Sequence, residues 1–141
     1  FAQGSDTMQR QVAEVDELLG DLTEAGEPWV IGGDFNLLPP GRQYDDLGPA
    51  QQEYYEPDTE LSVLTDTYPS VPSVEEATGD DRERWFTHAP NDPAVDGPDR
   101  TIDYLFHSPE VTLGDHAVRR DDTLDLSDHL PVIATYTLPE E

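Results

Sequence analysis

The stretch W-V-I-G-G-D-F-N, at residues 29–36, constrains the fold of this chain more than any other. It begins with three apolar residues typical of a buried strand, and two glycines follow that allow close approach to the backbone. The strand ends at Asp34 and Asn36, whose side chains point the same way if the backbone stays extended. Because ligands bind at strand ends in α/β sheets, both are candidates for a polar site. Taken alone, however, the stretch is explained slightly better as an ordinary strand and turn.

The charge of the chain is strongly unbalanced. Its 141 residues include 32 Asp and Glu against 7 Arg and no Lys, which gives a formal net charge of -25. Such a surface repels phosphate backbones, so non-specific binding of nucleic acid is disfavoured. Patterned apolar segments along the whole chain argue against disorder. We therefore expect a protein adapted to high salt, where ionic screening removes the self-repulsion.

Several classes of protein are excluded or left open by composition. The absence of cysteine excludes disulfides and thiolate metal sites. No apolar run approaches the roughly 18 residues that a membrane span needs. The first six residues lack the basic start and apolar centre of a signal peptide, although a chain that begins with Phe can have lost one. Cytoplasmic and secreted locations both remain open. The length fits one domain, residues 1–141, and not two.

Hydrophobic periodicity predicts the remaining elements. An apolar stripe at helical spacing predicts a helix over 8–22, capped at residue 5 or 6, ended by Gly20 or Gly26, and packed on the sheet that contains the Trp29 strand. His88 is a candidate substrate contact, but a lone His on a short strand is more commonly a packed or surface residue. The other expectations are a loop at 37–41, a short helix at 48–53, a helix or strand at 61–68, a surface loop at 69–79, and strands at 85–88, 110–119 and 132–136.

The stretch R-T-I-D-Y-L-F, at residues 100–106, is a predicted strand with an unusual carboxylate. Ile102, Tyr104 and Phe106 share one face, so Asp103 lies in mid-strand on the other face beside Leu105. A carboxylate among apolar neighbours costs several kcal/mol unless another group partners it. We therefore expect Asp103 to have a partner.

The stretch L-S-D-H-L-P-V, at residues 126–132, brings Asp128 and His129 to the start of the last strand. One Asp-His pair is weak on its own, but the three stretches together supply oxygen ligands for a hard cation, an amide donor, and a base with an orienting carboxylate. These are the groups that metal-assisted hydrolysis of a phosphate ester requires.

The three motifs carry a family resemblance. G-G-D-F-N at 32–36, T-I-D-Y-L-F at 101–106 and S-D-H-L-P-V at 127–132 resemble, in this order, the endonuclease/exonuclease/phosphatase (DNase I-like) superfamily. Its members include abasic-site DNA endonucleases, DNase I-like nucleases, inositol-polyphosphate phosphatases and neutral sphingomyelinases. The resemblance implies an α/β fold, a four-layer sandwich of two mixed β-sheets flanked by helices. It also implies a Mg²⁺ cofactor, with Mn²⁺ as an alternative, and a phosphate-ester substrate that is a small molecule, a lipid head group or a nucleic acid.

The resemblance also implies a role for each motif residue. Asp34 would position or activate the attacking water and contribute to the metal site, and Asn36 would hydrogen-bond the scissile phosphate. Asp128 would contribute to the metal site directly or through water. His129 would contact the phosphate and act as a base or an electrostatic stabiliser, with Asp103 holding its ring.

Only the C-terminal half of the family's domain resembles this chain. The family's strands that carry an upstream Asn, a metal-binding Glu and a T-H-L motif have no counterpart in residues 1–141. We therefore expect a chain that is inactive in isolation and associates with the N-terminal half of the domain or with itself. Two other functions remain open: a catalytically inactive remnant that serves as a binding or structural module, and an acidic cation-binding surface protein.

Overall fold

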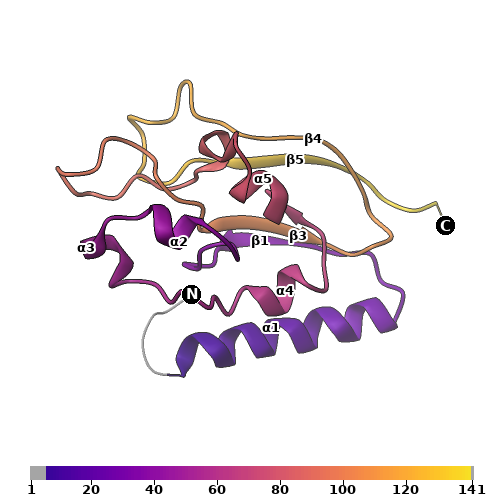
Figure 1. Cartoon of the computed structure of the whole chain (residues 1–141). Coiled ribbons are helices and arrows are strands. Elements are labelled where there is room, and N and C mark those ends of the chain that lie inside the picture. Colours follow the sequence, from indigo (N-terminus) through magenta and orange to yellow (C-terminus); the bar gives the residue numbers. More distant parts are fainter. Residues whose placement is uncertain (1–5, 141) are drawn as a thin grey trace.

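The computed structural model describes residues 6–140 as an α/β protein with two antiparallel sheets (Figure 1). No helix in this range is long and apolar enough to cross a membrane. In chain order the elements are α1 (Thr7–Glu24), β1 (Val30–Asp34), α2 (Gln43–Asp46), α3 (Pro49–Gln52), α4 (Ser62–Thr65), β2 (Ser70–Val71), α5 (Val74–Thr78), the 3₁₀ helix η1 (Arg82–Trp85), β3 (Asp103–His107), β4 (Thr112–Val118) and β5 (Val132–Thr137).

The sheets correct one expectation. The first has the strand order β1-β3-β2 and the second pairs β4 with β5. Every pairing among the described strands is antiparallel, so the prediction of mixed sheets is wrong for this part of the chain. The physical reason is direction: β1 and β2 both run opposite to β3, which lies between them. The expectations of four layers and of a half-domain stay predictions.

Helix α1 packs on the three-stranded sheet, as its apolar stripe predicts. Its buried residues Met8, Val12 and Leu19 join one core cluster with Trp29, Phe35, Tyr104 and Phe106, and α1 lies along one side of the sheet in Figure 1. The Trp29 indole donates from Nε1 to the Thr23 hydroxyl at 3.0 Å, which ties the end of α1 to the start of β1. The helix ends before Gly26, whose φ of 71° suits glycine.

Strand β1 is less buried than its sequence predicts. Trp29, just before the strand, is buried, whereas Val30 is 44% exposed and Gly32, Gly33 and Asp34 are exposed. The reason is position: β1 pairs only with β3 among the described strands and forms an edge of the sheet.

Local predictions in the middle of the chain succeed unevenly. The loop at 37–41, the short helix near 48–53 and the strands near 110–119 and 132–136 are confirmed, and 61–68 contains a helix. The surface loop expected at 69–79 is wrong, because Ser70 and Val71 are buried as strand β2 and α5 follows with a capping box. The strand expected at 85–88 is also wrong: η1 ends at Trp85, and His88 makes only isolated bridges.

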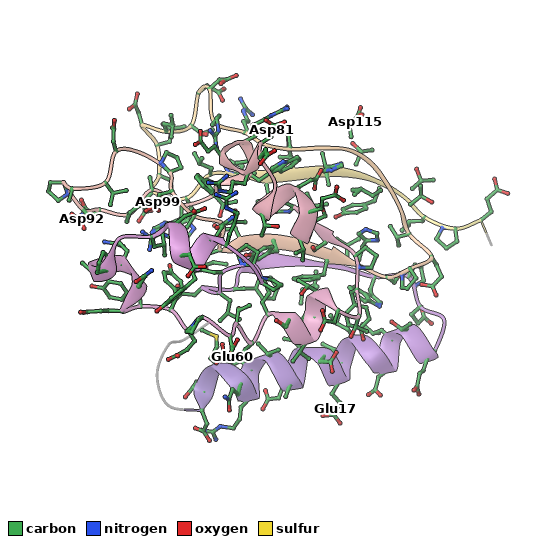
Figure 2. The ribbon with its side chains drawn as sticks, viewed as in Figure 1. Glu17, Glu60, Asp81, Asp92, Asp99 and Asp115 are labelled. Carbon is green, nitrogen blue, oxygen red and sulfur yellow. The ribbon has the colours of Figure 1, made fainter. Side chains whose placement is uncertain are left out.

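Acidic side chains cover the surface. Asp and Glu come from elements all around the ribbon, as the labelled residues Glu17, Glu60, Asp81, Asp92 and Asp115 show (Figure 2). Among the described residues no Asp or Glu is buried, whereas Arg100 is 2% exposed. The negative charge is therefore spread over surface that salt can screen.

Candidate active site

Two aspartates lie opposite each other at one end of the first sheet. Strand β1 ends at Asp34, strand β3 begins at Asp103, and the two residues are partners in the antiparallel register. Asp103 is therefore the first residue of its strand and not a mid-strand residue as the sequence predicts. The pairing explains how motifs about 70 positions apart reach one place, because an antiparallel ladder joins the end of one strand to the start of the next.

A tight turn follows β1 and sets the position of Asn36. This residue has a φ of 53°, and its backbone N–H donates to Asp34 Oδ1 at 2.8 Å. The prediction that Asp34 and Asn36 align by strand alternation is thus wrong, since the backbone leaves the extended region after Asp34. Phe35 anchors the turn between them: its side chain is 2% exposed, it contacts the Tyr104 ring edge-on, and its N–H donates to the Ile102 carbonyl at 2.9 Å.

The two glycines before Asp34 differ in what they allow. A Cβ on Gly32 would lie 2.4 Å from Leu105 Cδ2, whereas a Cβ on Gly33 would meet no atom within 4 Å. A side chain at position 32 would therefore require Leu105 to move, whereas position 33 has room for one.

A short backbone pairing delivers the Asp-His motif. The Leu130 N–H donates to the Thr87 carbonyl at 2.7 Å, and the Ala89 N–H donates to the Asp128 carbonyl at 2.8 Å. The intervening His88 forms an isolated antiparallel bridge with His129. The segment after η1 consequently holds Asp128 and His129 against the end of the first sheet where Asp34 and Asp103 lie, which we call the open end.

His129 lies between the two aspartates. Its Nδ1 is 3.0 Å from both Asp103 Oδ1 and Asp103 Oδ2, and its Nε2 is 4.0 Å from Asp34 Oδ2. The tautomer that satisfies Asp103 carries its proton on Nδ1, which leaves Nε2 facing Asp34. The ring of His88 lies beside it, with centroids 4.6 Å apart. The expected partner of Asp103 is thus found.

Asp103 is held in a more enclosed environment than Asp34. Their side chains are 16% and 46% exposed, respectively. Burial raises the pKa of the Asp103 carboxyl above its ordinary value, although hydrogen bonds from Thr87 and His129 oppose that change. The buried Thr87 hydroxyl also accepts from the Asp103 backbone N–H at 3.1 Å, so one side chain fixes both the backbone and the carboxylate.

Thr87 and His88 also contribute to the site, although the sequence singles out only His88, as a candidate substrate contact. Burial, together with the nearby His129 and Arg100, lowers the pKa of the His88 imidazole, which is therefore neutral near pH 7. No spacing rule links the T-H dipeptide at 87–88 to the later motif, because their contact depends on tertiary pairing. The one local signal is a His in a short segment that precedes residues 89–99, which are rich in Pro and Asp.

Two overlapping groups of side chains offer ligand atoms within 4.8 Å of one another. One contains Asp34, Asp103 and His129, and the other contains His88, Asp128 and His129. Oxygen donors from Asp34 and Asp128 suit a hard divalent cation, and imidazole adds a donor that Mn²⁺ tolerates better than Mg²⁺. The donor set therefore fits a divalent cation, with the predicted ligands Asp34 and Asp128 divided between two groups that share His129.

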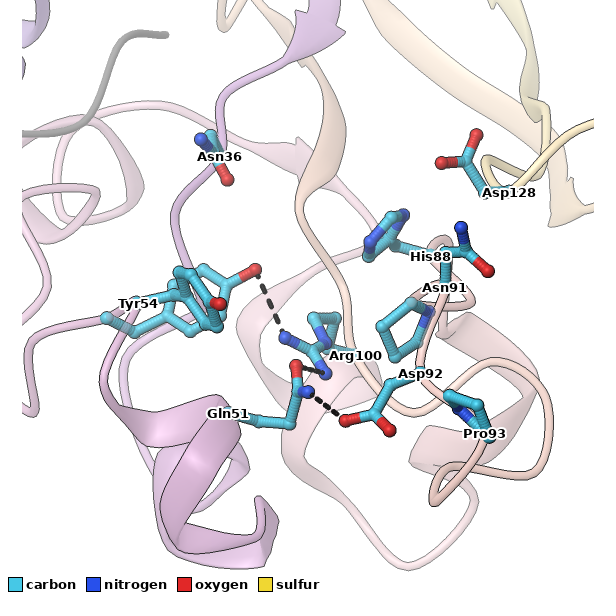
Figure 3. Close-up of a pocket in the computed structure, with 11 residues that line it drawn as sticks. Asn36, Gln51, Tyr54, His88, Asn91, Asp92, Pro93, Arg100 and Asp128 are labelled. Carbon is cyan, nitrogen blue, oxygen red and sulfur yellow. Dashed lines mark hydrogen bonds between the residues drawn. The ribbon is translucent and has the colours of Figure 1, made fainter.

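A cavity of about 430 Å³ opens beside these residues (Figure 3). Asn36, His88 and Asp128 lie on its wall, which makes the cavity continuous with the cluster around His129. Its other lining residues are Gln51, Tyr54, Tyr55, Pro90, Asn91, Asp92, Pro93 and Arg100. A ligand held at His129 could therefore extend into this space.

A carboxylate–imidazole–carboxylate cluster with a cation-compatible donor set and an adjacent cavity is compatible with metal-assisted hydrolysis. The model of the Endonuclease/Exonuclease/phosphatase family matches residues 2–129, and the chain belongs to that family. The resemblance seen in the three sequence motifs is thereby confirmed. No curated protein matches the chain in a sequence comparison.

Proposed function

We propose that this site hydrolyses a phosphate ester by metal-assisted attack of water. The observation that carries the proposal is the arrangement around His129: Asp103 holds Nδ1 at 3.0 Å, while Nε2 faces Asp34 across 4.0 Å. A water that lies to one side of this pair can be within hydrogen-bond reach of both Nε2 and Asp34 and can donate to each. Family membership supports hydrolysis of this class.

Each side chain then has a role in the proposal. Asp34 accepts a hydrogen bond from the attacking water and orients it toward phosphorus. Asn36 donates its side-chain amide to a phosphate oxygen from the turn that follows β1. His129 accepts a hydrogen bond from the attacking water at Nε2 and takes its proton, and Asp103 fixes the tautomer and orientation of the ring.

The metal belongs to the same proposal. Asp34 would hold Mg²⁺, or Mn²⁺ in its place, with Asp128 contributing directly or through water, and the bound cation would polarise the phosphate and neutralise developing negative charge. We also propose that the whole domain is a four-layer sandwich and that a further carboxylate from outside the described residues completes the metal site. A cation held by one or two carboxylates and water binds weakly, so this chain alone should have low metal affinity.

Metal binding and turnover test the proposal separately. Mn²⁺ binding, followed by water-proton relaxation, should weaken in Asp34→Asn and in Asp128→Asn but stay unchanged in Asp115→Asn, an exposed aspartate on β4. Catalytically competent protein, meaning the chain together with any segment that completes its site, should hydrolyse bis-p-nitrophenyl phosphate only with the metal. Asp34→Ala should abolish that turnover. Hydrolysis that continues without metal or in Asp34→Ala would contradict the proposed chemistry.

Completeness has its own test. If a further segment supplies a ligand, the isolated chain should bind Mn²⁺ weakly and show no measurable turnover. In size-exclusion chromatography it should elute as a complex with that segment or as an oligomer. Metal-dependent turnover by a well-behaved monomer, lost in Asp34→Ala, would support the chemistry and refute the need for another segment.

A further inference from the structure

The cavity beside the cluster has an unusual balance of charge for a phosphoesterase site. Among its described lining residues, Asp92 and Asp128 are acidic and Arg100 is the one arginine. A cavity that recognises a second phosphate normally presents Arg or Lys donors to it. Whether Arg100 can serve in that way therefore decides which ester arm, meaning the organic group bonded to the phosphate, fits the cavity.

The guanidinium of Arg100 is already committed to the protein. Its Nε and Nη2 donate to the Asp99 carboxylate at 2.7 and 2.9 Å, its Nη2 also donates to Gln51 Oε1 at 2.8 Å, and its Nη1 donates to the Tyr55 hydroxyl at 3.4 Å. With 2% of the residue exposed, each of its three nitrogens has an internal partner. Asp99 offsets its charge and four of its five N–H groups have these acceptors, so Arg100 supports the cavity wall and is a poor cation for a ligand.

The acidic and aromatic groups remain accessible. Asp92 accepts from Gln51 Nε2 at 2.8 Å on the same wall and is only half-buried (Figure 3). Tyr54 is 60% exposed, whereas the Tyr55 ring already lies under Arg100, with its centroid 5.4 Å from the guanidinium carbon. A carboxylate and an exposed aromatic ring attract a cation or tolerate a neutral group, but they repel an anion.

We infer that this cavity takes an ester arm that carries no second phosphate, namely a neutral or positively charged organic group. This inference rests on the proposed function, since the cavity is assigned to one arm of a phosphate ester held at His129. It separates such esters from polyphosphorylated or polynucleotide substrates, whose next phosphate would meet Asp92 without a compensating cation. The local charge acts in addition to the net charge of -25.

Equilibrium binding tests the inference without requiring turnover. The probes are glycerol 3-phosphate, phosphocholine and glycerol 1,3-bisphosphate, titrated into the chain in the presence of Mg²⁺ and followed by NMR shifts of the cavity residues. The first two should bind at least about tenfold more tightly than the bisphosphate, because like charges in a shared site are costly. Equal or tighter binding of the bisphosphate, or shifts of none of the cavity residues with any probe, would overturn the inference.

Two variants with a matched control locate the effect. Asp92→Asn should reduce the ratio of the Kd of the bisphosphate to the Kd of the monophosphates by about threefold. Asp115→Asn removes the same charge far from the cavity and should leave this ratio unchanged. Tyr54→Leu should weaken the binding of phosphocholine by about threefold and should change the binding of glycerol 3-phosphate little. If both aspartate variants narrow the preference equally, the discrimination comes from net charge and the cavity assignment is wrong.

Failure of this inference can be distinguished from failure of the proposed function. Loss of metal-dependent hydrolysis of bis-p-nitrophenyl phosphate in Asp34→Ala supports the hydrolytic proposal whatever the binding preference. Conversely, the expected binding preference in a protein whose hydrolysis continues without metal or in Asp34→Ala supports the inference about the cavity and contradicts the catalytic proposal.

Discussion

Two histidine–carboxylate pairs lie in different regions of this molecule and have almost the same geometry. At the open end of the first sheet, His129 Nδ1 is 3.0 Å from the Asp103 carboxylate. Between β4 and α5, His116 Nε2 is 2.9 Å from Glu76 Oε1. Distance alone therefore does not distinguish a candidate catalytic pair from a structural one.

The second ring nitrogen makes the difference. The other nitrogen of His116, Nδ1, is hydrogen-bonded to the Gly114 carbonyl at 2.9 Å, and the ring stacks on Trp85 with centroids 5.5 Å apart. Both of its nitrogens thus serve the fold. The other nitrogen of His129, Nε2, faces Asp34 at 4.0 Å in a cluster that adjoins the cavity. A histidine can act on a ligand only if one nitrogen is left for that ligand.

The largest expected effect separates the two histidines directly. In catalytically competent protein, His129→Gln should lower kcat/KM for bis-p-nitrophenyl phosphate by about 10²–10⁴-fold, a typical contribution of a catalytic acid–base group. His116→Gln, the matched control, should leave kcat/KM within about twofold because its ring makes only structural contacts. Similar losses in both variants would erase the distinction between the two regions.

Asp103 should act through His129. Asp103→Asn should lower kcat/KM by an amount similar to that of His129→Gln, and the double variant should lose little more, because residues that act as a unit are not additive. In the other region, Glu76→Gln should leave kcat/KM unchanged. If the fold-losses in kcat/KM of the two single variants multiply in the double variant, the two residues act independently.

The sequence indicated the residues of the first pair but not their surroundings. Asp34, Asp103 and His129 were predictable because each lies beside an apolar strand whose position the hydrophobic pattern sets. The turn at Asn36 was not, since a positive φ in a non-glycine residue depends on the anchoring of Phe35 in the core. His88 could not be placed either, because only backbone pairing between distant segments brings it to His129.

The fold shows the same limit in the second region. The prolines near residues 69 and 72 predict a surface loop, yet β2 completes the first sheet there and α5 supplies Glu76 to His116. A two-residue strand has no period of its own, so local pattern cannot identify it. The stacking of Trp85 on His116 likewise follows from the position of η1 against β4 and not from the strand expected at 85–88.

Salt should affect the whole chain and the second pair in opposite directions. With 32 carboxylates against 7 arginines, the melting temperature should rise by several degrees between dilute and molar KCl as repulsion is screened. The destabilisation caused by His116→Gln should shrink over the same range, because its partly exposed ion pair is screened too. A melting temperature that stays flat or falls with added KCl would contradict the salt-adapted interpretation.

The smallest expected effect is the pH dependence of the pair between His116 and Glu76. The hydrogen bond to the Gly114 carbonyl, together with Glu76, raises the pKa of His116 above its ordinary value of 6.5, although burial opposes this. Burial alone would raise the pKa of Glu76, but hydrogen bonds from Ser73 and His116 hold it below its ordinary value of 4.5. The contribution of His116 is complete below 6.5 and is lost as pH rises through its raised pKa, whereas that of Glu76 is complete above 4.5 and is lost as pH falls through its lowered pKa.

The pair should therefore stabilise the fold most between these two ordinary values. There, His116→Gln should lower the free energy of unfolding by about 0.5–1 kcal/mol, or the melting temperature by about 3 °C, because the two side chains are 24% and 29% exposed. Near pH 9 the wild type and the variant should melt within about 1 °C of each other, since the imidazole has then lost its charge. Paired thermal melts across this range measure the difference. A difference that does not change with pH would show that His116 stabilises the sheet of β4 and β5 by stacking on Trp85 and not through its charge.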